Sequence, residues 1–436
     1  MDWRGIGVFR FAEPEADSIN DLSVQRILAP ARTIVRHRGF VIVLVCSLVL
    51  GLAYSFVSPF MSMFGTLEVK MSPMRFGLFM VSTSLSAIVV STVLARWSDT
   101  HFSRRSLLIS GGICGALAYI GYAVIRDPLW LTFVGCTALA VSTITFSQLF
   151  AHARELLGRS DVSSAEAPLY INFFRLFFAL AWTVGPAAAS WVMVLFSYRG
   201  MFLTAAGIFA LFVLVVVRWV PATRPPASRA GAIHTPLLTT LTRPDVLAYF
   251  AGFVLINACG TISLMNLPLL VLHTLGGTPR HVGIIYSVGP LFELPLMLYF
   301  GVLASAGDQT RIIRMGTMIA VVYYVLLLFV REPWHVYPLQ VLSAAMVAVN
   351  SGIAITFFQN YLPGQPGTAT NLFVTSARLG STAGYLLFGW LAATLGYRTV
   401  FAFCAGLSFC TLLLFLHQHR QSRQRLSVVL PAPGTS

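Results

Sequence analysis

The amino-acid sequence predicts an all-α membrane protein in which 12 transmembrane helices form two six-helix bundles. Hydrophobic residues make up 57% of the 436 residues and charged residues only 10%, whereas soluble domains carry about 25% charged residues. Apolar runs of about 20 residues, long enough to cross a bilayer, recur along nearly the whole chain. Short motifs of the first half also recur in the second. These observations exclude an ordinary water-soluble enzyme.

The apolar runs fall into two sets of six predicted spans, separated by a polar segment. The first set comprises residues 40–60, 75–95, 106–125, 129–150, 168–189 and 201–219. The second set comprises residues 246–271, 281–304, 312–330, 336–358, 367–391 and 399–417. The expected organisation is a tail at 1–38, a first bundle at 39–220, a linker at 221–245, a second bundle at 246–418 and a tail at 419–436.

The segments outside the bundles are expected to be solvated. The first apolar run begins only at residue 40 and has no small-residue cleavage pattern directly after it, which indicates a retained span and not a secretory signal. The linker contains five prolines and three arginines, a composition that favours an extended chain.

The net charge of +14 indicates membrane topology and not nucleic-acid binding. Of the 29 basic residues only Lys70 is a lysine, and almost every arginine lies between apolar runs and not in a contiguous basic stripe. With the N-terminus in the cytoplasm, 20 of the 29 basic residues fall on the cytoplasmic side and seven on the opposite side. The positive-inside rule therefore predicts a multi-pass membrane protein with both termini in the cytoplasm.

The cysteines and loops show no pattern for a metal, a cofactor or ATP. All six cysteines fall inside apolar runs, and their spacing matches neither a disulfide framework nor a metal site. The chain also lacks the Gly-Lys loop that cradles nucleotide phosphates. We expect no cofactor, no metal and no nucleic-acid partner, and we expect an ion gradient as the source of energy.

Four motif pairs occur in the same order in both halves. They are Ser72-Pro73 with Thr278-Pro279, Asp99 with Asp308, Arg175-Leu176 with Arg378-Leu379, and Tyr198-Arg199 with Tyr397-Arg398, at shifts of 206, 209, 203 and 199 residues. Chance can supply one such match, but four in order at nearly one shift predict a duplicated six-helix unit. Two parallel repeats of this kind are related by a pseudo-two-fold axis along the membrane normal, and transporters so built hold substrate between the halves.

The loop after the second predicted span resembles a signature of the major facilitator superfamily. Members carry a Gly-x-x-x-Asp pattern that ends in paired basic residues at this loop, and Asp99, Arg104 and Arg105 match it, although Ala95 replaces the glycine. The Ser-Asp pair followed by a late Arg-Arg pair is similar to the sugar efflux transporter branch.

Two further stretches are similar to bacterial sugar efflux transporters: residues 181–186 in span five and residues 362–373 at the start of span eleven. The resemblance implies the major facilitator fold and export of small sugars or glycosides across the inner (plasma) membrane in exchange for protons. It also implies that the substrate and protons, together with the lipid bilayer, are the partners of a chain that works as a monomer.

Only Arg175, Glu293 and Arg378 are charged residues well inside the predicted spans. A charge near the centre of a membrane helix costs roughly 2.5 to 3.5 kcal/mol on insertion scales, so each is expected to face a cavity or a partner. Glu293 is a candidate for proton coupling, because a carboxylate whose Arg partner moves between two states can bind and release a proton. The alternative is a permanent ion pair of Glu293 with Arg378 or Arg175 that only holds helices together.

Several polar residues are candidates for substrate binding. Asn172, Arg175 and Trp182 share one helical face, which suits a polyhydroxylated ligand that also needs an apolar surface. Arg378, Tyr54 and Asn257 lie deep inside spans eleven, one and seven. The alternative is that these residues serve helix packing, or that Arg175 extends to the membrane interface.

Charged residues on the predicted cytoplasmic loops are candidates for a gate. They are Asp99, Arg104 and Arg105 in the first half and Asp308 and Arg314 in the second half. Salt bridges and helix-end contacts of such groups can hold the cytoplasmic face in one state and release it in the other. A plain positively charged loop is the alternative.

Three functions are compatible with these patterns to different degrees. A sugar exporter accounts for the motifs, and an exporter of drugs or other metabolites would keep the same fold with a different cargo. A membrane-embedded enzyme is disfavoured, because the loops are short, acidic residues total only 15, and no paired-carboxylate, His-rich or nucleophile motif occurs.

Overall fold

The computed structural model describes residues 38–98, 102–158, 167–221, 237–362 and 365–429, and these form helices joined by short connections. The main helices of the first half are α3 (Arg38–Ser55), α4 (Met61–Met63), α5 (Pro73–Ser98), α6 (Arg104–Val124), α7 (Pro128–Val134), α8 (Ala140–Ser142), α9 (Ile144–Gly158) and α10 (Ala167–Trp219). Those of the second half are α11 (Leu237–Leu241), α12 (Pro244–Leu269), α13 (Pro279–Ala306), α14 (Gln309–Leu328), α15 (Val336–Gly352), α16 (Ala354–Tyr361) and α17 (Pro366–Val429).

Short helical segments of other pitch link or extend these helices. They are the 3₁₀ turns η1 (Ser58–Phe60) and η5 (Pro333–His335) and the π-helical turns η2 (Phe64–Glu68), η3 (Gly135–Leu139) and η4 (Leu270–Thr274).

Proline and short polar residues set where many helices begin. Proline is the first residue of α5, α7, α12, α13 and α17, a position where its missing N–H group is not needed and its fixed φ suits the helix. Asp127 caps α7 by accepting hydrogen bonds from the N–H groups of Leu129 and Trp130 at 2.9 and 3.1 Å. Asp308 caps α14 in the same way through the N–H group of Thr310 at 2.9 Å. The helix boundaries therefore follow from local sequence.

Ten helices in the described part of the chain are long and apolar enough to cross a membrane, and two of them each contain a break. The stretch Tyr170–Trp219 has 50 residues and is interrupted at Ser197, which has a φ of 59°. The stretch Gly367–Gln421 has 55 residues and is interrupted at Gly396, which has a φ of 74°. Since about 20 residues suffice for one crossing, each of these two can form a hairpin of two spans, which is compatible with the 12 predicted.

The predicted repeat is visible in the backbone. Ser197 and Gly396 differ by 199 residues, which is the shift of the neighbouring Tyr-Arg pairs. Lys70 and Gly276 differ by 206 residues and have φ values of 60° and 64°. Each follows a π-helical turn, η2 in the first half and η4 in the second half. The two halves thus share a rare local conformation, which supports the duplicated unit predicted from the sequence.

The first and fourth spans are longer than the apolar runs predicted. The first stretch extends from Gly39 to Glu68, past the predicted end at residue 60. The ring of Phe64 is 1% exposed and packs on Phe202 with ring centroids 4.6 Å apart. Because this aromatic packing covers the segment, it stays helical beyond the run that hydropathy marks. The fourth stretch extends to Gly158, past the predicted end at residue 150.

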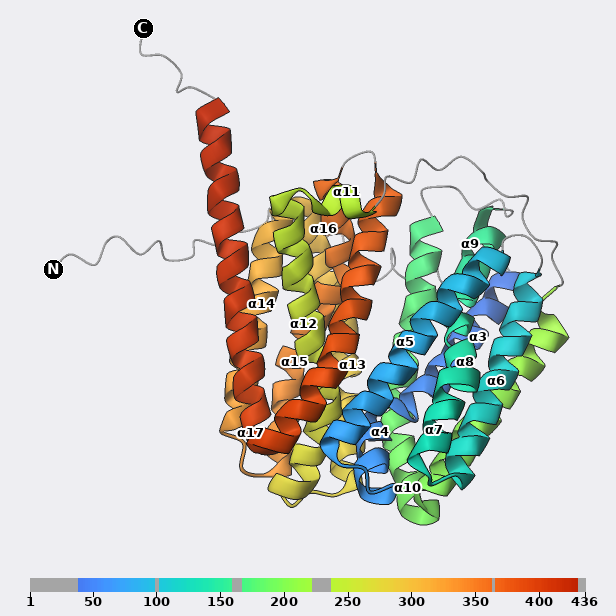
Figure 1. The fold of residues 1–436 in the computed structure, drawn as a ribbon. Helices are drawn as coiled ribbons and strands as arrows, with labels where there is room; N and C mark the ends of the chain where they lie inside the picture. The colour runs from blue at the N-terminus through green and yellow to red at the C-terminus, as the bar shows by residue number, and fades with distance from the viewer. Residues whose placement is uncertain (1–37, 99–101, 159–166, 222–236, 363–364, 430–436) are drawn as a thin grey trace, which may run out of the picture.

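Among the described residues, the main contacts between the halves are those of α5 with α17 and of α10 with α13, and α12 also contacts α4. The bundles lie side by side, close together at the end that contains α4 and further apart at the end that contains α9, α11 and α16 (Figure 1). Gly77 of α5 and Gly389 of α17 permit this approach, since a Cβ atom on Gly77 would lie only 2.9 Å from the Cα atom of Gly389.

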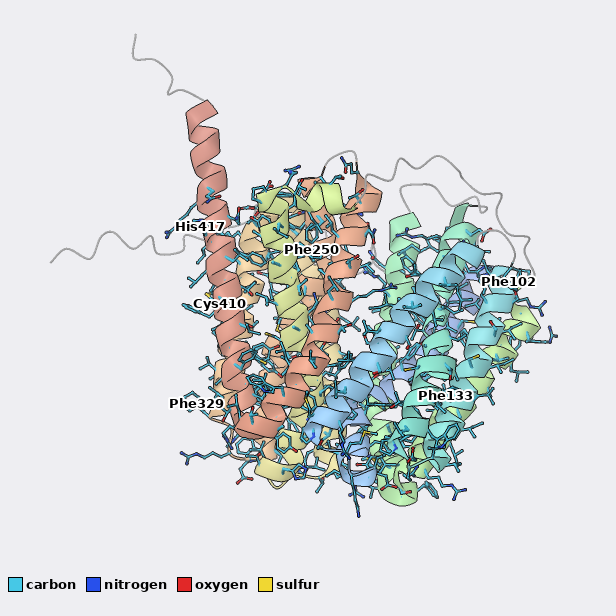
Figure 2. All side chains as sticks on the ribbon, in the orientation of Figure 1. Phe102, Phe133, Phe250, Phe329, Cys410 and His417 are labelled. Carbon is cyan, nitrogen blue, oxygen red and sulfur yellow. The ribbon has the colours of Figure 1, made fainter. Side chains whose placement is uncertain are left out.

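The outer surface of the bundles is apolar. Phe133 is 58% exposed and Phe329 is 72% exposed, and Figure 2 places both, together with Cys410, at the outside of the bundles. Exposed aromatic and aliphatic side chains over so much of the surface suit contact with lipid tails.

Candidate functional site

A cavity of about 540 Å³ lies between the two bundles. Its walls come from α3, η1, α4, α5, α6, η3, α8, α9 and one leg of α17. The polar side chains that line it are Tyr54, Ser58, Thr83, Ser84, Ser91, Tyr119, Tyr122, Thr143, Ser147, Arg378, Ser381 and Tyr385. A volume of this size is within the range of small-molecule sites.

The cavity is sealed at one end by contacts between the halves. The hydroxyl oxygens of Ser84 and Thr382 lie 2.9 Å apart and share a hydrogen bond between α5 and α17. The N–H group of Ala187 in α10 donates a hydrogen bond of 3.0 Å to the hydroxyl oxygen of Ser287 in α13. Gly77 and Gly389, which lie seven residues from Ser84 and from Thr382 respectively, approach closely where the bundles meet, so the cavity faces the end where α9, α11 and α16 diverge.

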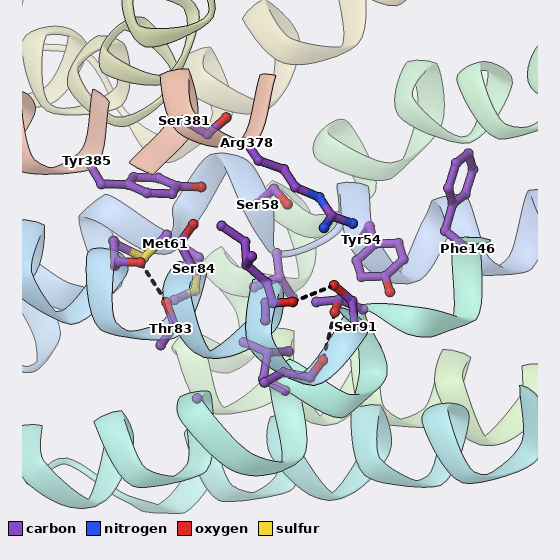
Figure 3. A pocket seen from close by; sticks show the side chains of 18 of the residues that line it. Tyr54, Ser58, Met61, Thr83, Ser84, Ser91, Phe146, Arg378, Ser381 and Tyr385 are labelled. Atoms are coloured by element: carbon purple, nitrogen blue, oxygen red, sulfur yellow. Dashed lines mark hydrogen bonds between the residues drawn. The ribbon is translucent and has the colours of Figure 1, made fainter. Parts of the chain in front are cut away.

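Arg378 is the sequence candidate that lies most directly in the cavity. It is exposed, and its guanidinium group points from α17 across the cavity toward Tyr54 and Ser58 (Figure 3). It makes no side-chain hydrogen bond or ion pair with another residue that the structure describes. The guanidinium group is therefore available to a ligand.

Tyr54 also lines the cavity, but its hydroxyl group is already engaged. It donates to the carbonyl oxygen of Ser142 at 3.0 Å and lies 3.0 Å from the hydroxyl oxygen of Thr145. A ligand would thus meet the ring of Tyr54 and not its hydroxyl group. Figure 3 shows the ring beside the guanidinium group of Arg378.

The polar stripe of span one serves two purposes. Ser47 donates a hydrogen bond of 2.9 Å to the carbonyl oxygen of Phe174, and Gly51 packs closely on Ala181. These two residues therefore belong to the seam between α3 and α10. Tyr54 and Ser58, further along the same stripe, line the cavity.

Asn172, Arg175 and Trp182 lie on α10 and are not among the residues that line this cavity. Arg175 is partly buried and makes no hydrogen bond to another described residue. At the repeat shift of 203 residues, Arg175 and Trp182 correspond to Arg378 and Tyr385, both of which line the cavity. The helix face predicted to bind substrate in α10 therefore corresponds, in the second half, to the face of α17 that lines the cavity.

Ser381 and Tyr385 are cavity residues that the sequence reasoning missed. They follow Arg378 at offsets of three and seven, which places all three on one face of α17. The same offsets separate Arg175 from Phe178 and Trp182. Applying the repeat shift to those residues would have found both.

Glu293 lies on α13, partly buried and outside the cavity lining. Among the described residues it forms no ion pair with Arg175 or Arg378, so neither of the permanent pairs considered as the alternative is present in this conformation. At the repeat shift of 206 residues its counterpart is Ala87, which lines the cavity from α5. The helix itself is continuous through Pro290 and Pro295.

Asn257 lies in a packing seam. Its side-chain amide donates to the carbonyl oxygen of Phe253 at 2.7 Å, one turn earlier in α12. A Cβ atom on Gly380 of α17 would lie 2.6 Å from the Cβ atom of Asn257. Asn257 is absent from the cavity lining.

The gate candidates lie at the end where the bundles diverge, and those described make contacts within their own half. Arg104 donates to the amide oxygen of Gln148 at 2.8 Å and lies 3.8 Å from Glu155. Arg105 donates to the carbonyl oxygen of Val217 at 2.5 Å.

In the second half Asp308 caps α14, and Arg314 donates to the carbonyl oxygen of Thr310 at 3.3 Å. Asp99 falls outside the described residues. The described gate residues thus secure helix ends in this conformation.

A cavity shared by two repeated helical halves, sealed at one end, is the architecture of an alternating-access membrane transporter. Comparison with known proteins agrees. The model of the Major Facilitator Superfamily matches residues 43–379 and 271–431. A Deinococcus radiodurans protein whose name assigns it to sugar efflux is 33% identical over 379 residues, which cover 86% of this chain and 97% of the relative.

Sugar efflux transporter A of Dickeya chrysanthemi is 30% identical over 84% of this chain and 93% of its own length, and sugar efflux transporter B of Salmonella typhimurium is 28% identical over 83% and 90%. The chain therefore belongs to the Major Facilitator Superfamily and, within it, to the family of sugar efflux transporters. The resemblance predicted from the loop and span motifs is confirmed.

Solved structures share the fold at low identity. The nucleoside transporter NupG has a TM-score of 0.72 at 14% identity, covering 87% of this chain and 99% of that one. A POT family transporter bound to a thioalcohol-conjugated peptide has a TM-score of 0.73 at 13% identity, covering 88% and 96%. At these identities the likeness concerns the fold alone, and it confirms the predicted major facilitator architecture.

Proposed function

We propose that this protein exports small sugars or glycosides by alternating access. The observation that carries the proposal is the cavity between the halves, in which serine, threonine and tyrosine side chains surround one arginine. Hydroxyl groups and a guanidinium group suit the hydroxyl groups of a sugar, and the ring of Tyr54 offers a surface for its apolar face. The printed names of the relatives point to the same cargo.

The described conformation corresponds to the state that loads cargo. The bundles diverge at the end that carries α11, which lies within the linker segment 221–245. The distribution of basic residues assigns this end, and both termini, to the cytoplasm. In a multi-pass protein of the inner membrane that acts as a monomer, the cavity then opens toward the cytoplasm, where an exporter must bind its substrate.

Proton exchange supplies the energy in this proposal, and Glu293 is the residue assigned to it. It lies in α13, which contacts α10 across the boundary between the halves. Its first-half counterpart, Ala87, faces the cavity, which supports a position for Glu293 on the corresponding face of the second half. A carboxyl group without an ion-pair partner in one state and with one in another changes its proton affinity between them.

Opening and closing would then move charged groups at the cytoplasmic end. Arg104, Arg105, Asp308 and Arg314, together with Asp99, are proposed to form the cytoplasmic gate by exchanging their present contacts within each half for contacts between the halves.

The test uses the purified protein in liposomes with an imposed pH gradient and a panel of labelled glucosides, galactosides and cationic drugs. Gradient-dependent movement of a sugar together with counterflow of protons is the expected result. Movement of drugs without sugars would reassign the cargo and keep the fold. Liposomes that contain Gly77→Leu protein, in which a large side chain replaces the glycine at the sealed end, are the inactive control.

A further inference from the structure

Among the described residues, one charged side chain lines the cavity. Of all the residues that line it, Arg378 alone carries a charge at neutral pH, and neither an aspartate nor a glutamate is among them. Its guanidinium group points into the open space and makes no side-chain hydrogen bond with another described residue (Figure 3). The walls of the cavity therefore leave one positive charge without a balancing group.

An unbalanced charge inside a membrane protein is unfavourable, and more so when water is excluded. A guanidinium group in a closed cavity loses its hydration without gaining an opposite charge. Alternating access requires that the cavity close around the cargo. A cargo that brings one negative charge would remove this penalty, since a carboxylate accepts two parallel hydrogen bonds from one guanidinium group.

Four hydroxyl groups in the cavity already use their protons in hydrogen bonds within their own helices. Thr83, Ser91, Thr143 and Ser147 each donate to a carbonyl oxygen of their own helix at 2.7 to 3.0 Å. Their oxygen atoms therefore face the cavity mainly as acceptors. These four side chains thus offer hydrogen-bond acceptors, which suit the donor O–H groups of a sugar, whereas the hydroxyl groups of Tyr119 and Tyr122 in the same half make no hydrogen bond to another described residue and can also donate.

The opposite wall offers donors. Arg378, Ser381 and Tyr385 project from α17, and the hydroxyl groups of Ser381 and Tyr385 make no hydrogen bond to another described residue. A ligand with hydroxyl groups on one side and an anionic group on the other would satisfy both walls. The charge count favours a carboxylate over a phosphate monoester, which carries about 1.5 to 2 negative charges at neutral pH.

We propose that the preferred cargo is a sugar acid with one carboxylate group, such as a uronic acid, bound with the carboxylate on Arg378 and the ring hydroxyl groups toward α5, α8 and α9. This inference rests on the proposed export of sugars and narrows its substrate class. Neutral sugars would bind the same cavity more weakly, because they leave the guanidinium charge unbalanced.

The experiment compares two sugars that differ at one carbon atom. Counterflow of labelled glucose and of labelled glucuronate is measured in liposomes that contain the wild type, Arg378→Gln, Arg378→Lys or Arg331→Gln. In the wild type, half-saturation is expected at a glucuronate concentration at least tenfold lower than the glucose concentration. One charge-assisted pair of hydrogen bonds is strong enough to account for a difference of this size. Arg378→Gln should reduce the ratio to about one by weakening glucuronate alone, and Arg378→Lys should retain part of it.

Arg331→Gln is the matched control, because Arg331 is an exposed arginine in the loop before α15, outside the cavity. If Arg378→Gln fails to fold, the thermal stabilisation of the wild type by glucuronate and by glucose compares the two affinities directly.

Three results would overturn the proposal. They are equal affinities in the wild type, an unchanged ratio in Arg378→Gln, and stronger inhibition of glucuronate counterflow by unlabelled glucose 6-phosphate than by unlabelled glucuronate. If neither glucose nor glucuronate moves in any preparation, the proposed sugar export is contradicted. If both move with equal affinity, only the proposed preference for the sugar acid is contradicted.

Discussion

Ser84 and Thr382 are joined by a hydrogen bond of 2.9 Å between their hydroxyl oxygens, although 298 residues separate them in the chain. The bond connects α5 of the first half with α17 of the second, close to the cavity that both helices line. It is a direct contact that must break when the sealed end opens. The balance between the two states of the transporter should therefore depend on it.

Ser84→Ala should shift the protein toward the state in which this end is open. Hydrogen bonds between membrane helices contribute about 0.6 kcal/mol on average, so we expect a roughly threefold change in the ratio of the states. The measurement is the labelling rate of a single cysteine placed at the sealed end, in a background with the native cysteines replaced. Ser82→Ala is the control, since Ser82 bonds only to Leu78 of its own helix. An unchanged labelling rate would remove the bond from the gate.

Gly77→Ala should slow transport at least tenfold without unfolding the protein. The added Cβ atom would lie 2.8 Å from the carbonyl oxygen of Tyr385 and 2.9 Å from the Cα atom of Gly389, so α5 and α17 would have to separate. Turnover in liposomes and elution as a single species in detergent test this together. Gly301→Ala is the control, because its Cβ atom would meet no heavy atom within 4 Å. Equal turnover in both variants would contradict close packing as a requirement.

Tyr54→Phe should leave transport nearly unchanged, whereas Tyr54→Ala should weaken sugar binding. The hydroxyl group of Tyr54 forms hydrogen bonds with the carbonyl oxygen of Ser142 and the hydroxyl group of Thr145. These two groups are also hydrogen-bonded to each other, so both keep a partner when the hydroxyl group of Tyr54 is removed. The ring faces the cavity. Half-saturation of counterflow is the quantity to measure, and a Tyr54→Phe variant as weak as Tyr54→Ala would show that the hydroxyl group binds the cargo directly.

Lys70→Gly and Gly276→Ala should change thermal stability in opposite directions. Both positions have φ near 60°, in the left-handed region that residues with a Cβ atom adopt at a cost of about 1 kcal/mol. Lys70→Gly removes that cost, and Gly276→Ala introduces it. Unfolding temperatures in detergent should rise slightly for the first variant and fall for the second. Changes of the same sign in both would show that the loops do not share this constraint.

Glu293→Gln should abolish export driven by a pH gradient while leaving exchange of substrate between the two sides. The amide keeps the size of the carboxyl group but cannot exchange a proton. Gradient-driven export and counterflow are compared in the same liposomes, with Glu332→Gln, an exposed acid in the loop before α15, as the control. Normal gradient-driven export by Glu293→Gln would exclude this residue from coupling.

Much of the fold was predictable, because membrane spans and helix ends depend on residues that are close together in the sequence. Apolar runs of membrane length indicated the spans, and the prolines and polar caps that the structure shows at many helix starts are equally local signals. The paired breaks at Ser197 and Gly396 match a repeat found from sequence alone. The length of the first span was underestimated, because Phe64 is held in its helix by aromatic rings from other helices.

The site was predictable only in part. Arg378 and Tyr54 line the cavity, and the charge of one and the depth of the other in an apolar run had marked them. Asn257 was marked by the same depth, yet it lies in a seam where Gly380 approaches closely. Polarity inside a membrane helix indicates that a residue needs a partner, but it does not tell whether that partner is a ligand or another helix.

The sequence by itself determined the membrane location, the duplicated bundle, the family motifs and the few charges that a bilayer makes costly, because each depends on composition or on spacing along one helix. Only the tertiary structure decided which end is sealed, which faces enclose the cavity and that Arg378 stands in it without an opposite charge. Those properties arise where α5 meets α17 and where α10 meets α13, and contacts between distant segments are not encoded in the periodicity of either segment.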